Sequence, residues 1–165
     1  MIAISGSHGF VATNLAKLLP LKPIPRELLK NKFALVRYLK NIDTVIHTAA
    51  YGNYFFQKGD RKVFEVNVVY TLNLLEAAKE AGVKKFVNFS SSYELGTKDK
   101  PMSENMVVRP ETIYGITKAC GTQLTRHFSK FLNTAVTPPV VTSSVIVGVD
   151  TYTPPTMVPC TSVGP

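Results

Sequence analysis

The sequence contains no tryptophan, only two cysteines and no long uninterrupted apolar run. Cys120 and Cys160 lack the spacing of a metal site or of a disulfide framework, which favours a reduced, cytoplasmic setting. No apolar stretch approaches the roughly 20 residues that a membrane-spanning helix needs. The chain starts on an apolar, strand-like segment, not on a cationic leader. We therefore expect neither a metal site nor a membrane span.

A basic stripe interleaved with aromatic residues, typical of nucleic-acid binding, is also missing. The formal net charge is +8, but the lysines and arginines are scattered along the chain. We interpret this charge mostly as solvated surface that could steer a nucleotide-linked ligand by long-range attraction. The 165 residues, 45% hydrophobic and 18% charged, suit one globular domain.

Strand-like and helical patterns alternate along the chain. Apolar strand-like runs occupy residues 2–5, 43–50 and 83–92, with a poorer one near 22–25. Helical spacing of apolar residues covers 10–19, a stretch ending near Ile42, 62–82 and 114–130. This alternation predicts a doubly wound α/β fold, a Rossmann domain with a parallel sheet.

The last 33 residues have a different composition. From Asn133 onward the only charged residue is Asp150, whereas Pro, Thr, Ser and Val accumulate. We expect one strand at about Val140 to Val147, a Rossmann domain over residues 1–148, and an irregular proline-rich tail over 149–165.

A glycine-rich turn joins the first strand to the first helix. "SGSHGFVA" supplies Gly6, Gly9 and Ala12 at three-residue intervals. Such spacing permits a tight turn, a close approach of the main chain to a pyrophosphate and close helix–strand packing. Small residues at such a turn can also serve packing alone, so the turn is not decisive by itself.

Tyr114 and Lys118 lie four residues apart in "ETIYGITKACG", so they share one face of a helix. A nearby ammonium lowers the pKa of a phenol from about 10, as a general base requires. The same spacing arises by chance in many helices. "SSS", Ser90 to Ser92, ends a predicted strand at the same sheet edge, where a hydroxyl could bind a substrate hydroxyl or carbonyl, or simply enter a turn.

Several motifs together resemble the extended short-chain dehydrogenase/reductases, the NAD(P)-dependent epimerase/dehydratase family, over roughly residues 1–132. "ISGSHGFVATNL" is similar to the family's T-G-x-x-G-F-I-G opening, and "DTVIHTAA" to D-x-V-x-H-x-A-A. "NVVYTLNLLEAAKEAGVKKFVNFSSS" and "YGITK" resemble two further motifs, N-V-x-G-T-x-N-L-L-E-A-A-x-x-A-G-V-K-R-F-V-Y-x-S-S and Y-G-x-S-K, in the right order.

The resemblance implies hydride transfer between a substrate carbon and the nicotinamide of NAD or NADP. It assigns Tyr114 as acid/base and Lys118 as the group that lowers its pKa and binds the nicotinamide ribose. An ungapped match to F-V-Y-x-S-S-x-x-V-Y-G makes Ser91 the functional serine, with Ser92 as the alternative. The cofactor-binding residues that it implies are Gly6, Gly9, Phe10, Val11, Ala12, Arg26, Ala49, Ala50, Asn67, Tyr114 and Lys118.

The chain also departs from the family pattern. Tyr70 stands where the family usually has glycine, which puts the local helix packing in question. Only about one strand and one helix fit between Leu19 and Asp43, and no Asp is available there to bind the NAD ribose. Arg26 could instead accept the NADP phosphate, or be a solvated residue. The proline-rich C-terminal part implies little or no substrate domain.

We therefore expect an NAD(P)-dependent oxidoreductase, epimerase or dehydratase acting on a nucleotide-sugar, without a nucleic-acid or membrane partner. One alternative is a 3β-hydroxysteroid dehydrogenase-like enzyme, to which "VIHTA" and Glu94 are also similar. Another is a truncated, non-catalytic dinucleotide-binding protein. A homodimer could form through helices 68–81 and 114–131, where four apolar residues could serve the interface or the core: Leu72, Leu75, Leu124 and Phe128.

Overall fold

The computed structural model describes residues 1–137 apart from 55, 98–101 and 104. Its centre is a five-stranded, all-parallel sheet in the order β2-β1-β3-β4-β5. The strands are β1 (Ile2–Ser5), β2 (Leu21–Pro23), β3 (Thr44–His47), β4 (Lys85–Asn88) and β5 (Asn133–Val136). This confirms the predicted doubly wound, Rossmann-like fold.

Helical segments connect the strands. The α-helices are α1 (Phe10–Leu15), α2 (Lys32–Leu39), α3 (Asp60–Phe64), α4 (Tyr70–Glu80) and α5 (Ile113–Phe128). Two 3₁₀ turns, η1 (Arg26–Lys30) and η3 (Ser92–Leu95), and one π-helical turn, η2 (Glu65–Val69), complete the set.

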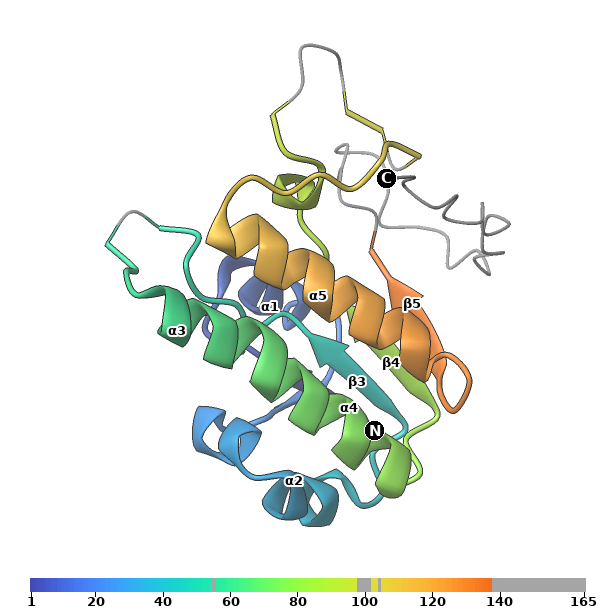
Figure 1. Cartoon of the computed structure of the whole chain (residues 1–165). Coiled ribbons are helices and arrows are strands. Elements are labelled where there is room, and N and C mark those ends of the chain that lie inside the picture. The colour runs from blue at the N-terminus through green and yellow to red at the C-terminus, as the bar shows by residue number, and fades with distance from the viewer. Residues whose placement is uncertain (55, 98–101, 104, 138–165) are drawn as a thin grey trace.

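The helices form layers on the two faces of the sheet (Figure 1). Helices α4 and α5 lie side by side in front of it, α2 packs against α4, and α1 lies behind the sheet. The main core fills the space under α2, α4 and α5 and includes fully buried Leu35, Leu39, Val45, Leu74 and Phe86. Behind the sheet, α1 covers a small cluster of Ile4, Ala12 and Ile46.

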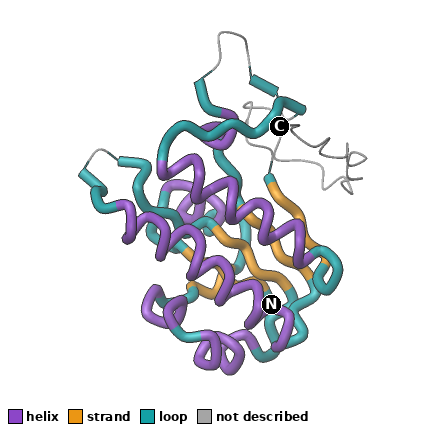
Figure 2. The backbone as a smooth tube through the Cα atoms, viewed as in Figure 1, coloured by secondary structure: helices purple, strands orange, loops and turns teal. Residues whose placement is uncertain are grey.

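The strand ends are aligned at one edge of the sheet, as the tube in Figure 2 shows. In register, Ser5 pairs with His47, and His47 pairs with Asn88. The segments that follow β1, β3 and β4 therefore leave the sheet next to one another, at the carboxyl edge where ligands of such folds bind.

A single helical run connects β3 to β4, as the sequence predicts, but it contains an unexpected wide turn. It passes from α3 through the π-helical turn η2 into α4 without a break. The run ends at Gly82, whose φ of 75° is the left-handed conformation that glycine adopts without a Cβ penalty. Helix π-turns frequently mark functional sites, and this one holds Asn67.

Three local predictions need correction. Helix α1 ends at Leu15 rather than continuing to Leu19. The segment before Ile42 is a 3₁₀ turn followed by α2, because Asn31 caps a new helix by accepting a hydrogen bond from the Ala34 amide. Strand β5 begins at Asn133, whereas the first strand predicted in this part of the chain begins near Val140. The predicted strand at Val140 to Val147 and the tail 149–165 lie outside the described residues.

Within the described ranges, no helix combines the length and the apolar character that crossing a bilayer requires.

Candidate functional site

The glycine turn brings β1 into direct contact with the segment after β3. Gly6 has φ of 73°, and a Cβ atom on it would lie 2.7 Å from the main-chain nitrogen of Ala49. Gly9 donates its amide to the Gly6 oxygen (2.9 Å) and precedes α1 without a side-chain cap. Ala12 lies on the side of α1 that faces the sheet. It is 1% exposed and packs against Ile4 and Ile46. Glycine at position 6 is thus required both by its left-handed backbone conformation and by the close contact with the Ala49 main chain.

A cavity of about 710 Å³ opens beside this turn. Five of the predicted cofactor-binding residues line it: Gly6, Gly9, Arg26, Ala49 and Ala50. It is also lined by Ser7, His8, Pro23, Ile24, Pro25, Glu27, Leu29, Thr48, Tyr51, Gln57, Val66 and Tyr70. Its size is within the usual 300–1,000 Å³ of small-molecule sites. The predicted Phe10, Val11 and Ala12 do not line it, and Phe10 is 82% exposed.

Tyr70, which replaces the family's usual glycine, is accommodated inside the fold. Its side chain is 2% exposed, belongs to the main core and forms part of the cavity wall. Its hydroxyl donates to Glu65 Oε1 at 2.8 Å, and Glu65 also pairs with Lys62 at 2.7 Å. The tyrosine therefore narrows the cavity without leaving its hydroxyl unpaired.

Asn67 does not line the cavity; its side chain hydrogen-bonds the loop after β3 and helix α5. Its side chain accepts from the Tyr51 amide (2.8 Å) and donates to the Tyr51 carbonyl (2.8 Å). The same amide group donates to Thr117 Oγ1 at 3.0 Å, and Thr117 donates to the Tyr114 carbonyl at 2.9 Å. Asn67 thus fixes the loop that walls the cavity against the first turns of α5.

A second chain of buried hydrogen bonds runs through His47. Its Nδ1 is 2.6 Å from Ser5 Oγ, and its Nε2 is 2.8 Å from Thr71 Oγ1. Thr71 donates its own hydroxyl hydrogen to the Asn67 carbonyl (2.8 Å), so it must accept from His47 Nε2–H. Burial lowers the pKa of His47 to about 3, and the charge of Lys118 acts in the same direction. His47 is a neutral link between β1 and α4.

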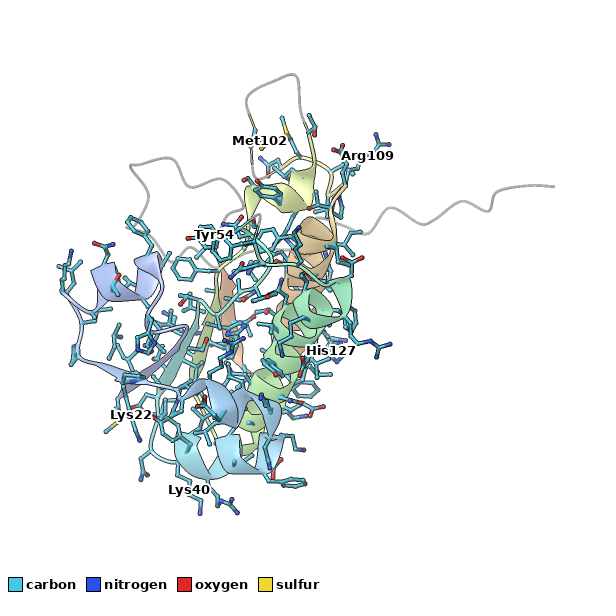
Figure 3. The ribbon with its side chains drawn as sticks, turned by 90° about the vertical axis from the view of Figure 1, so that its left-hand side faces the viewer. Lys22, Lys40, Tyr54, Met102, Arg109 and His127 are labelled. Atoms are coloured by element: carbon cyan, nitrogen blue, oxygen red, sulfur yellow. The ribbon has the colours of Figure 1, made fainter. Side chains whose placement is uncertain are left out.

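The Ser91 side chain lies within hydrogen-bonding reach of Tyr114. Burial raises the pKa of Tyr114, whereas a hydrogen bond from Ser91 lowers it. The Tyr93 ring packs edge-on against the Tyr114 ring, with centroids 5.4 Å apart and an interplanar angle of 86°. Figure 3 places Tyr54 at the same end of the molecule as Met102 and Arg109, opposite Lys40.

Lys118 lies on the same face of α5 and is 8% exposed. Its ammonium donates to the main-chain carbonyl of Phe89 at 2.5 Å, at the end of β4. Burial lowers the pKa of Lys118 to about 8, and the charge of Glu94 raises it. In this structure the ammonium is thus anchored to the strand end, and the group that lowers the pKa of Tyr114 is Ser91.

A close backbone contact brings these groups together. Thr112 caps the start of α5, because its hydroxyl accepts from the Gly115 amide at 3.0 Å. A Cβ atom on Gly115 would lie 2.3 Å from the Tyr93 carbonyl oxygen. Only glycine at this position lets α5 approach η3 closely enough for Tyr114 to reach Ser91.

Sequence reasoning missed several residues that build this site. The His47–Thr71 link, Thr117, Tyr51 and the buried Glu94 were not predicted to take part. The histidine of "DTVIHTAA" was a usable signal, because a lone polar residue inside an apolar strand needs a buried partner. The other contacts depend on the tertiary arrangement alone.

An all-parallel sheet with a glycine turn at its carboxyl edge, beside a large cavity, defines the class of Rossmann-like α/β domains. The chain belongs to the NAD dependent epimerase/dehydratase family, whose model matches residues 2–140.

Known proteins agree with this assignment. The chain is 33% identical over 121 residues to a Bacillus subtilis (strain 168) protein described as "Uncharacterized UDP-glucose epimerase YtcB", covering 67% of this chain and 36% of that protein. Among solved structures, MoeE5 in complex with UDP-glucose and NAD superposes with a TM-score of 0.71 at 30% identity, covering 82% of this chain and 52% of that one. UDP-glucuronic acid 4-epimerase from Bacillus cereus, in complex with NAD, gives a TM-score of 0.71 at 25% identity, covering 82% and 54%. The chain thus spans about half the length of the solved structures and about a third of the curated relative.

Proposed function

We propose that this protein is an NAD(P)-dependent oxidoreductase of the epimerase/dehydratase type that acts on a nucleotide-sugar. The observation that carries the proposal is the convergence of Ser91, Tyr114 and Lys118 at the sheet edge that also bears the glycine-turn cavity. A phenol hydrogen-bonded to a hydroxyl, with a buried ammonium on the same helix face, is suited to move a proton to or from a substrate oxygen.

The residues around the cavity fit a dinucleotide. Gly6 and Gly9 leave the main chain of the turn open to a close approach, and Ala49 and Ala50 provide a low wall opposite. Arg26 supplies a cation at the end of β2, where the adenosine ribose of such cofactors is bound. A bound nicotinamide ring would supply hydride transfer, which no side chain of this protein can perform.

Within that scheme each residue has a distinct task. Tyr114 holds or releases the proton at its phenol oxygen, and Ser91 donates a hydrogen bond that stabilises the phenolate. Lys118, on α5, holds its positive charge at the end of β4, where its ammonium donates to the Phe89 carbonyl. Tyr93, 50% exposed and packed on Tyr114, offers an aromatic face at the mouth of the site.

The substrate class is supported by the relatives. MoeE5 is solved with UDP-glucose, and the Bacillus subtilis relative is described as a UDP-glucose epimerase. We extend a nucleotide-sugar substrate to this chain on that basis. Turnover assays that compare nucleotide-sugars with 3β-hydroxysteroids as substrates separate this proposal from the steroid dehydrogenase alternative.

The test is a thermal-shift comparison of NAD⁺, NADP⁺ and UDP- or GDP-sugars on the purified chain, followed by turnover assays with Tyr114→Phe as the matched variant. We expect a dinucleotide to raise Tm in both proteins, and Tyr114→Phe to abolish turnover because it removes only the phenol hydroxyl. Turnover by Tyr114→Phe at the wild-type rate would refute the role of Tyr114.

A second candidate function is dinucleotide binding without turnover. It is favoured by the cavity beside the glycine turn, which Ser91, Tyr114 and Lys118 do not line. Stabilisation by a dinucleotide, together with no oxidation or reduction of any nucleotide-sugar, would select this candidate over the first.

We also propose a homodimer through the outer faces of α4 and α5, which lie side by side (Figure 1). Leu75 and Phe128 are buried in the core of the monomer, and Leu72 and Leu124 are half-buried against it. The exposed apolar residues on or next to these helices include Phe64, Val69, Ile116 and Phe131. Sedimentation of wild type and Ile116→Glu, at concentrations where both are folded, tests this contact: loss of a wild-type dimer in the variant supports it.

A further inference from the structure

Two buried side chains of opposite charge lie under the candidate site. Glu94 is 2% exposed and Lys118 is 8% exposed. Among the residues that the structure describes, they are the one buried carboxylate and the one buried ammonium. Burying a charge is costly unless a counter-charge and hydrogen bonds compensate it, so their shared location calls for an explanation.

Hydroxyl groups from two different elements hold Glu94. Ser90 Oγ and Thr122 Oγ1 each donate to Glu94 Oε1 at 2.9 Å. Ser90 follows β4, and Thr122 lies one turn beyond Lys118 on α5. An oxygen that accepts two hydroxyl hydrogen bonds is suited to an ionised carboxylate, because a carboxylate only accepts.

The charge of Glu94 acts on both candidate site residues. Burial lowers the pKa of Lys118 to about 8, and Glu94 opposes that effect. Burial also raises the pKa of Tyr114, and Glu94 adds to the rise, as do Tyr93 and Tyr54. His47, on β3, is the remaining titratable group that interacts with this cluster, and burial keeps it neutral.

The position of Glu94 is unusual for the family pattern. When Phe86 to Gly96 is matched without a gap to F-V-Y-x-S-S-x-x-V-Y-G, Glu94 falls on the valine. The position that the pattern gives to valine is occupied by a buried carboxylate in this chain.

We propose that Glu94 is a positioning residue: its carboxylate, fixed by Ser90 and Thr122, is the buried counter-charge that keeps Lys118 an ammonium beside Tyr114. Its bearing on catalysis rests on the proposed function. The electrostatic effect of Glu94 on Lys118 does not, because it is a property of the folded protein without substrate. Removing the charge at Glu94 should leave Lys118 buried beside neutral groups, which favours the uncharged amine.

The test follows the titration of Lys118 in the full chain, with lysines labelled with ¹³C at Cε and the Lys118 signal assigned by its loss in Lys118→Arg. We expect Glu94→Gln to lower the pKa of Lys118 by about one unit or more, the usual effect of losing a close opposite charge. Glu80→Gln removes an exposed carboxylate that pairs with Lys32, and should leave the Lys118 titration unchanged. An unaltered Lys118 pKa in folded Glu94→Gln would overturn the proposal.

A second variant covers the case in which Glu94→Gln does not fold. Glu94→Val places the residue of the family pattern at this position and removes the same charge, so it should also lower the pKa of Lys118. A Lys118 pKa that is the same in folded Glu94→Val and wild type overturns the proposal as well.

Activity provides a separate readout. Where turnover is measurable, Glu94→Gln should move the acidic limb of the pH–rate profile to lower pH, because a charge that raises the pKa of Tyr114 is gone. Glu94→Asp, which keeps the charge, should restore the profile. If the Lys118 titration is unchanged in Glu94→Gln, this inference is wrong and the proposed function is unaffected. If Tyr114→Phe is active, the proposed function is wrong and this inference is unaffected.

Discussion

Gly115 of α5 lies directly against the main-chain carbonyl of Tyr93, where an added Cβ atom would be only 2.3 Å from the oxygen. This contact determines how closely the helix that carries Tyr114 and Lys118 approaches the turn that carries Ser91.

Gly115→Ala should therefore separate the two elements. We expect a loss of about 1–3 kcal/mol of stability, the usual cost of overpacking, which exceeds the roughly 1 kcal/mol that alanine contributes to a helix. Chemical denaturation measures the change. Gly121→Ala is the control on the same helix, because its Cβ would lie at an ordinary 3.4 Å from the Asn67 oxygen, and it should be neutral or stabilising. Equal effects of the two substitutions would contradict the role of the Tyr93 contact.

Gly6→Ala should impair both folding and dinucleotide binding. Gly6 combines φ of 73° with a Cβ position 2.7 Å from the Ala49 nitrogen. Gly82 has φ of 75° with nothing within 4 Å, so Gly82→Ala isolates the conformational cost of about 1–2 kcal/mol. We expect Gly6→Ala to cost more than Gly82→Ala, and to abolish the rise in Tm with NAD⁺ or NADP⁺ that Gly82→Ala retains. A full cofactor response in Gly6→Ala would show that the turn is not part of the binding site.

His47 should make the protein sensitive to mild acid. Its pKa is about 3 in the folded protein against an ordinary value of 6.5, so the unfolded chain binds the proton first as the pH falls. The stability that this group contributes is complete above pH 6.5 and is lost as the pH falls toward 3, by at most about 1.4 kcal/mol per pH unit. Urea unfolding between pH 7 and pH 5 should show this slope in wild type.

His47→Gln should flatten that slope, because glutamine does not titrate. His127→Gln, which replaces an exposed histidine at the end of α5, should keep it. A slope that persists unchanged in folded His47→Gln would mean that another group is responsible.

Arg26 is expected to decide between the two cofactors. It lines the cavity just after β2, and no aspartate is present there to bind an unphosphorylated ribose. Arg26→Ala should weaken NADP⁺ binding by about tenfold, which corresponds to about 1.4 kcal/mol, and change NAD⁺ binding less. Calorimetric titration of both cofactors measures the difference. Equal losses for NAD⁺ and NADP⁺ would assign Arg26 a general electrostatic role.

The sequence predicted those features that rest on local patterns. Strand β1, the glycine turn and the helix ended by Gly82 follow from periodicity and turn chemistry. Strand β5 was missed because "NTAV" is short and continues into a proline-rich stretch, and only pairing with β4 makes it a strand.

The charges at the site could not be predicted in the same way. "SSSYEL" is polar and typical of an exposed turn, yet tertiary packing buries Glu94 against α5. Helical spacing placed Lys118 near Tyr114, but could not show that its ammonium binds the Phe89 carbonyl. Both facts depend on where the end of β4 lies relative to α5. The tertiary structure sets that distance, and the residue pattern of a single strand or helix does not reveal it.

The buried hydrogen bonds from Ser5 through His47, Thr71 and Asn67 to Thr117 have a consequence for mutagenesis. Each of these side chains bridges two elements, so the chain joins β1, β3, the wide turn and α5 into one cooperative unit. Once one link is cut, the remaining partners have already relaxed, and cutting a second link should cost less than it does in the intact protein. Ser5 and Thr117 lie at opposite ends of this chain of hydrogen bonds and share no contact. In a double-mutant cycle, Ser5→Ala and Thr117→Val together should therefore lower the free energy of unfolding by less than the sum of their separate effects.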